Sequence, residues 1–499
     1  MGINDTLGIA RTGIQSHQSA IQTVARNIAN QSTPGYARQR AVFSPIASVL
    51  LPGGVAQGGG SQIIEVDRVV DQAVQDQLQR ERARLAFAEV QESGLSRAED
   101  ILQSLEGASL SDATNSLFRS LNDLAADPGS PTAREAVVQS AQALTSQIQS
   151  VDLRISQLET DLNESISRTV TEVNSISREI VELNGQIRDR EFISQSSSEL
   201  RDRRDQLLEE LGQKIDFTSF ERADGTVTVF VAGGFLLTDG LARAELTTST
   251  LQPTPLAQPN FVNVFQNLNG SIAGPITSRV TGGELGALIS LRDDTVQELR
   301  QQVDRFAFSL ADRVNTVHAA GRGLVDDSSR NLFVDRTAAT LGAPPGAALS
   351  SVLGAAQRIG INPDILANGL HLAAGTPAAG AASSGDNTNA LALASLQSQS
   401  AAVFDIGDPP GGPASGASQT LTGFLAGLTG ALGADLRAAR STVSTQELVV
   451  RELESRRDAT SGVSVDEEIS NLVRYQRGFE ANARVLSTVD ELLGLLLQI

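Results

Sequence analysis

The side chains that most often carry enzymatic chemistry are sparse in this sequence. It has three histidines (His17, His318 and His371) and no cysteine among its 499 residues. Without cysteine, the chain can form neither thiolate metal sites nor disulfides, and it has no cysteine nucleophile. The patterns G-x-S-x-G, G-x-x-x-x-G-K-[ST] and H-E-x-x-H, typical of hydrolases, phosphate-binding loops and zinc proteases, do not occur. We therefore expect no enzymatic activity, no metal site and no cofactor.

The most densely charged stretch runs from Glu199 to Glu210 and alternates acidic with basic residues. A group of carboxylates could bind a metal or exchange protons. Alternating signs on a helix more often form a solvated face whose charges pair with one another, and we favour that interpretation. Paired acids elsewhere stay open as an alternative, because the chain has 58 carboxylates whose separations the sequence does not give.

The composition allows a folded protein and argues against nucleic acid as a partner. Hydrophobic residues make up 40% of the chain and charged residues 19%, and the length suffices for two to four domains. The net charge is −19, and no long basic run occurs. Nucleic acids and anionic membranes attract clustered Lys and Arg, so neither is expected as the main partner. The longest apolar tract, Leu492 to Leu497, is far shorter than the roughly 20 residues that span a bilayer.

Both ends of the chain carry the apolar spacing of coiled-coil helices. Near the N-terminus the seam consists of Ile3, Leu7, Ala10, Ile14, His17, Ile21, Val24 and Ile28. Near the C-terminus it consists of Val465, Ile469, Leu472, Gln476, Phe479, Ala483, Leu486, Val489, Leu493 and Leu496. Steps of three and four residues are typical of a helix that packs along another helix. We expect the two seams to pair with each other or with neighbouring subunits.

Two polar residues interrupt these seams. His17 lies in the first seam and Gln476 in the second. A histidine there could sense pH, but a polar residue that fixes the register of two helices is the more common role. An antiparallel arrangement would bring His17 and Gln476 close together, and we state that contact as a hypothesis.

The middle of the chain predicts a long helix and a β insertion. From Leu144 to Ile187 apolar residues step at close to 3.6 positions, which predicts a nearly straight helix of roughly 65 Å. Short alternating segments joined by glycine turns favour a small β domain over residues 213–283. Helical periodicity returns from Leu285 to His318. Residues 321–418 are rich in Ala, Gly, Pro and Ser and are expected to form loops and short elements.

The expected fold class is therefore mainly α, with long helices, terminal coiled-coil segments and a small inserted β domain. The expected segments are 1–60 (terminal coil and linker), 61–212 (helical rod), 213–283 (β insert), 284–430 (helices and Ala/Gly-rich loops) and 431–499 (C-terminal helices, with the coiled coil from 463).

The two ends resemble the signatures of flagellar rod, hook and hook-associated proteins. The N-terminal pattern is carried by ARNIANQSTPGYARQR, in which Asn27, Ile28, Ala29, Asn30, Thr33, Pro34, Gly35, Tyr36, Arg38 and Gln39 fill the places of that family. The segment 464–497 resembles the matching C-terminal pattern, although Phe479 stands where many members have Tyr. The residues that fit are Asp466-Glu467-Glu468, Asn471-Leu472, Tyr475-Gln476 and Ala481 to Val485. Thr33, Pro34 and Gly35 also predict a turn that ends the first helix, because Pro sets φ and Gly accepts positive φ.

Interior segments resemble the hook-associated protein 1 family in particular. They are ELNGQIRD (182–189), ELRDRRDQLLEEL (199–211), GGELGALISLRD (282–293), ADRVNTVHAAGRGL (311–324) and DNTNALALASLQ (386–397). Arg201-Asp202-Arg203 departs from the more apolar Leu-Leu-Asp type expected there, which puts one local contact in doubt. The competing interpretations are another axial protein, such as hook or rod, and a coiled-coil signalling rod.

The resemblance implies a structural subunit of the bacterial flagellum that caps the hook and joins it to the filament. Implied partners are the hook protein, the next junction protein, copies of this chain and a cytoplasmic chaperone at the C-terminal helix. Implied export is through the flagellar type III pathway to the cell exterior, consistent with an N-terminus that lacks the apolar core of a secretory signal. We expect the terminal helices to fold on assembly. The expected interface residues are Ile3, Leu7, Ile14, Ile21, Val24, Ile28, Asn30, Pro34, Gly35, Tyr36, Arg38, Ile469, Leu472, Tyr475, Gln476, Phe479, Leu486 and Leu493.

Overall fold

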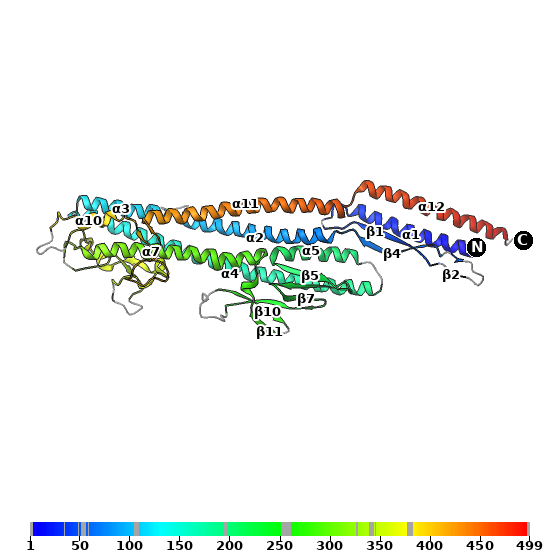
Figure 1. The fold of residues 1–499 in the computed structure, drawn as a ribbon, viewed down its shortest axis with the longest axis horizontal. Coiled ribbons are helices and arrows are strands. Elements are labelled where there is room, and N and C mark those ends of the chain that lie inside the picture. Colours follow the sequence, from blue (N-terminus) through cyan, green and yellow to red (C-terminus); the bar gives the residue numbers. More distant parts are fainter. Residues whose placement is uncertain are drawn as a thin grey trace. The chain divides into compact units, whose positions relative to one another are not determined.

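Long helices dominate the computed structural model, and short strands occupy a smaller part of the chain (Figure 1). The structure describes residues 3–33, 35–47, 49–50, 56–57, 59–103, 109–193, 197–250, 261–268, 270–325, 328–338, 344, 346–376 and 383–496. The mainly α fold class with a small β insertion is confirmed.

The long helices largely follow the predicted periodicities. They are α1 (Ile3–Ala29), α2 (Gln72–Gln103), α3 (Leu110–Ala126), α4 (Pro131–Phe192), α5 (Ser198–Lys214), α7 (Val296–Ala320), α11 (Leu421–Ser461) and α12 (Val465–Leu496). The periodic stretch 144–187 lies inside α4, which extends beyond it at both ends. Helices α2 and α3 lie inside the expected helical rod of residues 61–212, but the sequence analysis did not delimit them individually, and it overlooked the buried stripe Leu110, Leu117, Leu121 and Leu124 of α3. In α2, Gln, Glu and Arg fill most of the positions between its few buried residues.

The chain forms two compact units, each assembled from separate stretches of sequence. Unit 1 contains Met1–Phe87, Ser167–Gly286 and Val443–Ile499, and unit 2 contains Ala88–Ile166 and Ala287–Thr442. Helices α2, α4 and α11 contribute residues to both. The units therefore do not follow the linear segments expected from the sequence.

In unit 1 the two ends of the chain meet. Helices α1 and α12 lie side by side (Figure 1), and they are antiparallel, since Gly13 packs against Asn482 while Asn27 bonds to Glu468. A hairpin of β1 (Gln39–Pro45) and β4 (Ser61–Arg68) packs against α1, with Gln39 opposite Arg68. Two short strands, β2 (Val49–Leu50) and β3 (Ala56–Gln57), pair between them. The hairpin was not predicted from the sequence.

The β insert forms two antiparallel sheets in unit 1. One has the order β5-β6-β7-β8, from β5 (Phe217–Glu221), β6 (Val227–Val231), β7 (Phe235–Asp239) and β8 (Ala242–Arg243). The other has the order β11-β10-β9, from β9 (Glu245–Ser249), β10 (Asn263–Leu268) and β11 (Ser271–Pro275). Buried Asn184 on α4 ties the first sheet to the helix, because its amide donates to the backbone oxygens of Val227 and Gly240. All these strands lie within residues 213–283.

In unit 2, α3, α7 and part of α4 pack against many short elements. These are α6 (Gly283–Ser290, only its end), a π-helical turn (Leu291–Thr295), β12 (Phe333–Asp335), α8 (Ala355–Arg358), β13 (Ile359–Ile361), α9 (Pro363–Ala367), a 3-10 turn (Gly369–His371), α10 (Thr388–Ser395), β14 (Ala401–Ala402) and β15 (Ser418–Gln419). The stretch 321–418 contributes core residues, among them Phe333, Ile359 and Leu372. Its short elements thus form part of a packed core.

Helix α5 corrects the interpretation of the charged run at 199–210. Asp202 and Arg204 are buried, and their partners lie on other elements: Arg68 on β4 for Asp202, and Glu221 on β5 for Arg204. Arg201 bridges Glu191 and Glu221. The expectation of a solvated, self-paired face was therefore wrong, because the helix lies between the hairpin and the β insert of unit 1.

Candidate assembly site at the paired termini

The elbow after α1 begins with a turn, as the sequence predicts. Gly35 has a φ of +73°, a conformation that side-chain-bearing residues rarely adopt. A Cβ atom at this position would also collide with the side chain of Gln206 on α5. Both the positive φ and the close approach of Gln206 favour glycine at this corner. Pro34 lies outside the described residues.

Asn27 is the centre of the polar network at the elbow. Its side chain is fully buried, and its Nδ2 donates to the backbone oxygen of Gln39 (2.8 Å) and to Glu468 Oε2 (3.1 Å). Its Oδ1 accepts from the Gln39 backbone N–H (3.0 Å) and from the Tyr36 hydroxyl (2.9 Å). One amide therefore joins α1, the elbow, β1 and α12. Burial beside the carboxylate of Asp202 raises the pKa of Tyr36 to about 12, so its hydroxyl stays a donor.

Arg38 completes this network on the side of α12. Its Nε donates to Glu468 Oε1 (2.8 Å) and its Nη1 to Glu467 Oε2 (2.7 Å), while its backbone N–H donates to the Ser461 carbonyl (3.0 Å). Glu468 is buried, and a buried carboxylate is stable only when it is paired in this way. The N-terminal and C-terminal signatures therefore bind each other within one chain.

The contact between α1 and α12 uses smaller residues than the predicted seam. The buried positions of α1 include Ala10, Gly13, Ser16, Ala20, Thr23, Val24 and Asn27. His17 packs against Gly478 and forms a ring cluster with Phe43 and Tyr475, with centroids 5.7 and 6.2 Å away. Burial lowers the pKa of His17. Gln476 is exposed, so the structure places His17 against Gly478 and Tyr475 in place of the hypothesised contact with Gln476.

The predicted interface residues fall into three groups in this structure. Half-buried ones are Leu7, Ile14, Ile21, Ile28, Asn30, Tyr36, Arg38, Leu472, Tyr475, Phe479, Leu486 and Leu493. Val24 is buried, whereas Gly35, Ile469 and Gln476 are exposed. Ile3 begins α1, and its side chain lies outside the described residues. The sequence analysis assigned no interface role to Asn27 or Glu468, although Asn27 lies in the quoted motif. A run of small and polar residues at steps of three and four was the available signal.

Several large apolar side chains on α12 remain uncovered. Ile469 (48% exposed) and Val473 (40%) lie near its start, and Val485 (42%) and Leu492 (48%) near its end. At 100° per residue, the first pair projects on one flank of the face that meets α1, and the second pair projects on the other flank. This chain alone therefore leaves apolar surface on both sides of its terminal pair.

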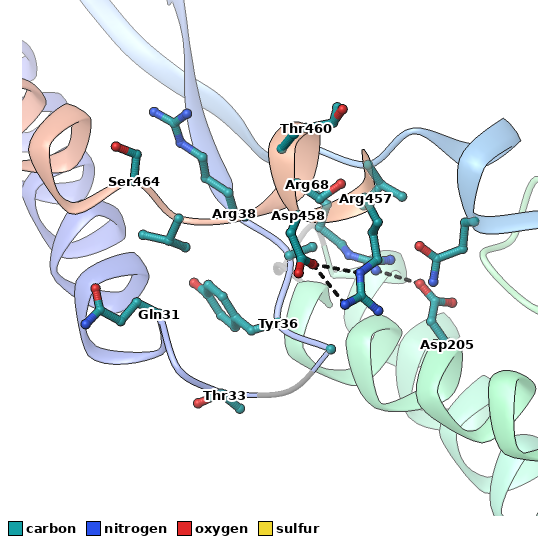
Figure 2. Close-up of a pocket in the computed structure, with 18 of the residues that line it drawn as sticks. Gln31, Thr33, Tyr36, Arg38, Arg68, Asp205, Arg457, Asp458, Thr460 and Ser464 are labelled. Atoms are coloured by element: carbon teal, nitrogen blue, oxygen red, sulfur yellow. Dashed lines mark hydrogen bonds and ion pairs between the residues drawn. The ribbon is translucent and has the colours of Figure 1, made fainter. Parts of the chain in front are cut away.

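A polar cleft of about 600 Å³ lies beside the elbow in unit 1. Figure 2 shows its lining side chains, which include Tyr36 and Arg38 from the elbow, Arg68, Asp205 on α5, and Arg457 and Asp458 at the end of α11. Arg68 is paired with Asp205 (2.6 Å), and Arg457 with Asp458 (2.9 Å).

Metal sites and membrane spans are two other classes of feature that bear on function. Among the described residues, no cluster of three or more His, Cys, Asp or Glu side chains could hold a metal ion. No helix in the described part of the chain combines the length and apolar character needed to cross a bilayer.

Comparison with known proteins identifies the class. Residues 95–333 match the model of the flagellar hook-associated protein FlgK helical domain, and residues 455–499 match that of the flagellar basal body rod FlgEFG protein C-terminal domain. The chain is therefore related to the flagellar axial proteins, as its terminal motifs indicate.

Relatives that align over nearly the whole chain carry one name. Flagellar hook-associated protein 1 of Escherichia coli (strain K12) is 25% identical, with 98% of each chain covered. That of Bacillus subtilis (strain 168) is 24% identical, with 98% of this chain and 96% of the relative covered. The flagellar hook junction protein FlgK from Burkholderia pseudomallei has a similar fold: its structure aligns with a TM-score of 0.62 at 18% identity, covering 77% of this chain and 100% of that one. The resemblance to the flagellar hook-associated protein 1 family is confirmed.

Proposed function

We propose that this chain is a structural subunit of the bacterial flagellum that forms the junction between hook and filament. The observation that carries the proposal is the similarity to hook-associated proteins 1 over 98% of the chain. The terminal site supports it, because both ends of the chain converge on one polar network and leave apolar residues uncovered beside it. The chain acts by packing, without catalysis.

The assembly interface comprises the half-buried and exposed apolar residues of α1 and α12. In an isolated chain, α1 buries mainly Ala, Gly, Ser and Asn against its neighbours, and such residues contribute little hydrophobic stabilisation. Helices with an uncovered apolar face are marginal in water. The terminal helices therefore become stably ordered when neighbouring subunits cover Ile469, Val473, Val485 and Leu492.

The partners of this interface are the hook protein, the next junction protein and further copies of the chain. These contacts join different surfaces of successive subunits, as in any helical lattice. A cytoplasmic chaperone covers the apolar stripe of α12 before export through the flagellar type III pathway, and the chain functions outside the cell. Marginal terminal helices suit this route, because a chain that unfolds at low cost passes a narrow channel readily.

Deletion of the gene tests the proposed function. We expect intact hooks without filaments in electron micrographs, with flagellin released into the medium. Normal filaments would contradict the junction role. Missing hooks would assign the chain to the hook or rod class.

Hydrogen–deuterium exchange of the purified full-length chain tests folding on assembly. We expect fast exchange across residues 3–28 and 465–496 and slow exchange in the buried parts of α4. Slow exchange across residues 3–28 would show that the terminal helices are already stable in the isolated chain.

A further inference from the structure

The terminal segment, defined as α1, the β1–β4 hairpin and α12, joins the rest of unit 1 through two short connections. Residues 69–71 link β4 to α2, and residues 462–464 link α11 to α12, each without regular secondary structure. Val70 and the residues from Ser461 to Ser464 line the polar cleft of about 600 Å³. A small apolar cluster of Leu78, Val450 and Leu453 joins α2 to α11. This cluster contains no residue of the terminal segment.

Side chains on one face of α5 contact the hairpin directly beside this cleft, which Arg68 and Asp205 help to line. Arg68 on β4 places its Nε 2.7 Å from Asp202 Oδ1 and its Nη2 2.6 Å from Asp205 Oδ2. Two residues earlier on β4 and four residues earlier on α5, the Ser198 hydroxyl donates to the carbonyl oxygen of Val66 at 3.5 Å. Residues four apart on a helix share a face, so Ser198 and Asp202 form a row on α5 that meets β4 at Val66 and Arg68.

The charged groups of this contact are largely buried. The Arg68 side chain is 15% exposed and that of Asp202 is 9% exposed. Burial raises the pKa of Asp202 to about 6, and the neighbouring Arg68 opposes that shift. The guanidinium of Arg68 donates a hydrogen bond to Asp205 and forms an ion pair with Asp202, and loss of one partner would leave buried charge uncompensated.

We propose that Arg68, Asp202 and Asp205 form a clamp that fixes the hairpin on α5 and so determines where the terminal segment leaves the rest of unit 1. The clamp acts in the single chain, before the terminal helices are covered by neighbours. It gives those helices an anchored base on which to fold. Arg68, Asp202 and Asp205 are thus positioning residues for assembly.

A disulfide across the row tests the clamp. The chain has no cysteine, so Val66→Cys and Ser198→Cys introduce the only two thiols. In the purified full-length chain under mild oxidation, we expect most molecules to form this disulfide, seen as a gel shift. Adding Arg68→Gln should lower the crosslinked fraction at least about threefold, because Asp202 and Asp205 lose their charged partner and the intact hairpin can then move away from α5.

Matched controls separate the clamp from general damage. Arg203→Gln removes a guanidinium of α5 whose side chain is 53% exposed and lies 3.7 Å from Glu179. This change should leave the crosslinked fraction unchanged. A second pair, Arg40→Cys with Asp67→Cys, joins directly opposed residues within the hairpin and should still crosslink in the presence of Arg68→Gln. If Arg68→Gln prevents folding, Asp202→Asn with Asp205→Asn tests the same contact from α5.

An equal crosslinked fraction with and without Arg68, or an equal loss caused by Arg203→Gln, would overturn the clamp. The measurement uses the isolated chain, so it does not depend on whether the protein caps hooks. Failure of the proposed function would appear in the deletion strain and would leave this result unaffected.

Discussion

Helix α4 and the α1–α12 pair are both long and apolar in sequence, but they bury different kinds of side chain. In α4, branched aliphatic residues such as Leu144, Ile155 and Ile180 are fully buried. In the terminal pair, the fully buried residues of α1 include Ala20 and Asn27, while the larger apolar groups stay half-covered. The aliphatic stripe of α4 is thus buried within the chain, whereas much of the apolar surface of the terminal pair is only half-covered.

The difference has an energetic consequence. Burial of a Leu or Ile side chain contributes about 1.5–3 kcal/mol, whereas Ala contributes much less. The terminal pair substitutes a polar network for that stabilisation. A network of this kind fixes one register more than it adds stability. We infer that α4 supplies the stability of the subunit and that the terminal pair supplies its specificity for neighbours.

The largest effect is expected from truncation of the α4 core. Leu144→Ala should destabilise the chain by about 2–5 kcal/mol, because it leaves a cavity in a packed interior. Leu153→Ala on the same helix is the matched control, since Leu153 is 70% exposed and its loss should cost no more than about 0.5 kcal/mol. Urea unfolding followed by circular dichroism measures both. Equal effects of the two substitutions would contradict the claim that the aliphatic stripe of α4 supplies the stability of the subunit.

A pH-dependent effect of similar size is expected at His318 in unit 2. Its Nδ1 lies 2.7 Å from the Arg330 carbonyl, and its Nε2 accepts from the Ala373 backbone N–H at 3.0 Å. Burial lowers the pKa of His318 to about 4, from 6.5 in the unfolded chain. The folded state thus favours the neutral ring, and the associated stability, about 3 kcal/mol, is present above pH 6.5 and is lost as the pH falls towards 4.

Thermal unfolding at several pH values tests this assignment. His318→Gln cannot titrate, so it should flatten the decline in melting temperature between pH 6.5 and 4.5. His17 in the terminal pair is only half-buried, and His17→Gln should change the decline much less. A larger effect from His17→Gln than from His318→Gln would show that the terminal pair, and not the core of unit 2, carries this pH dependence.

The sequence predicts apolar faces well, because the period of a helix directly determines them. The buried stripe of α4 and the seam positions of α1 and α12 lie in helices, as expected. Periodicity does not show which face a single chain covers. Asn27 and Glu468 were missed as site residues for that reason: their pairing spans 441 positions, and a lone Asn or Glu gives no local sign of burial.

Charge patterns are equally ambiguous. The run at 199–210 suggests a solvated face, yet Asp202 and Arg204 are buried because partners from β4 and β5 reach them. The strands β1 and β4 are joined by the long connection 46–60. Its Pro-Gly-Gly run at 52–54 is a turn signal, but nothing in the sequence shows that strands so far apart pair with each other. Such contacts depend on elements distant in the chain, and a single sequence does not reveal which of them meet.

The polar network should show a moderate effect. Glu468→Gln removes a buried charge that accepts from Asn27 and Arg38, and should weaken the local structure by about 1–3 kcal/mol. Glu467→Gln is the control, because Glu467 also binds Arg38 but is 63% exposed and should cost less than about 1 kcal/mol. Exchange of the Gln39 amide measures the change locally. Similar exchange rates in the two variants would show that the network does not hold the elbow.

The smallest effect on the isolated chain, and the most informative one, is expected on the exposed flank of α12. Leu492→Ala should alter the unfolding free energy by no more than about 0.5 kcal/mol, since the side chain is half in water. In the assembled flagellum the same change removes apolar area from a subunit contact, at about 1–2 kcal/mol per contact. Repeated around the junction, this loss should lower the fraction of hooks that bear filaments.

Thr488→Ala, a change at an exposed polar neighbour on the same helix, should leave that fraction unchanged. If Leu492→Ala supports filaments as well as Thr488→Ala does, the uncovered residues of α12 are ordinary surface, and the incompleteness of the terminal pair has another cause.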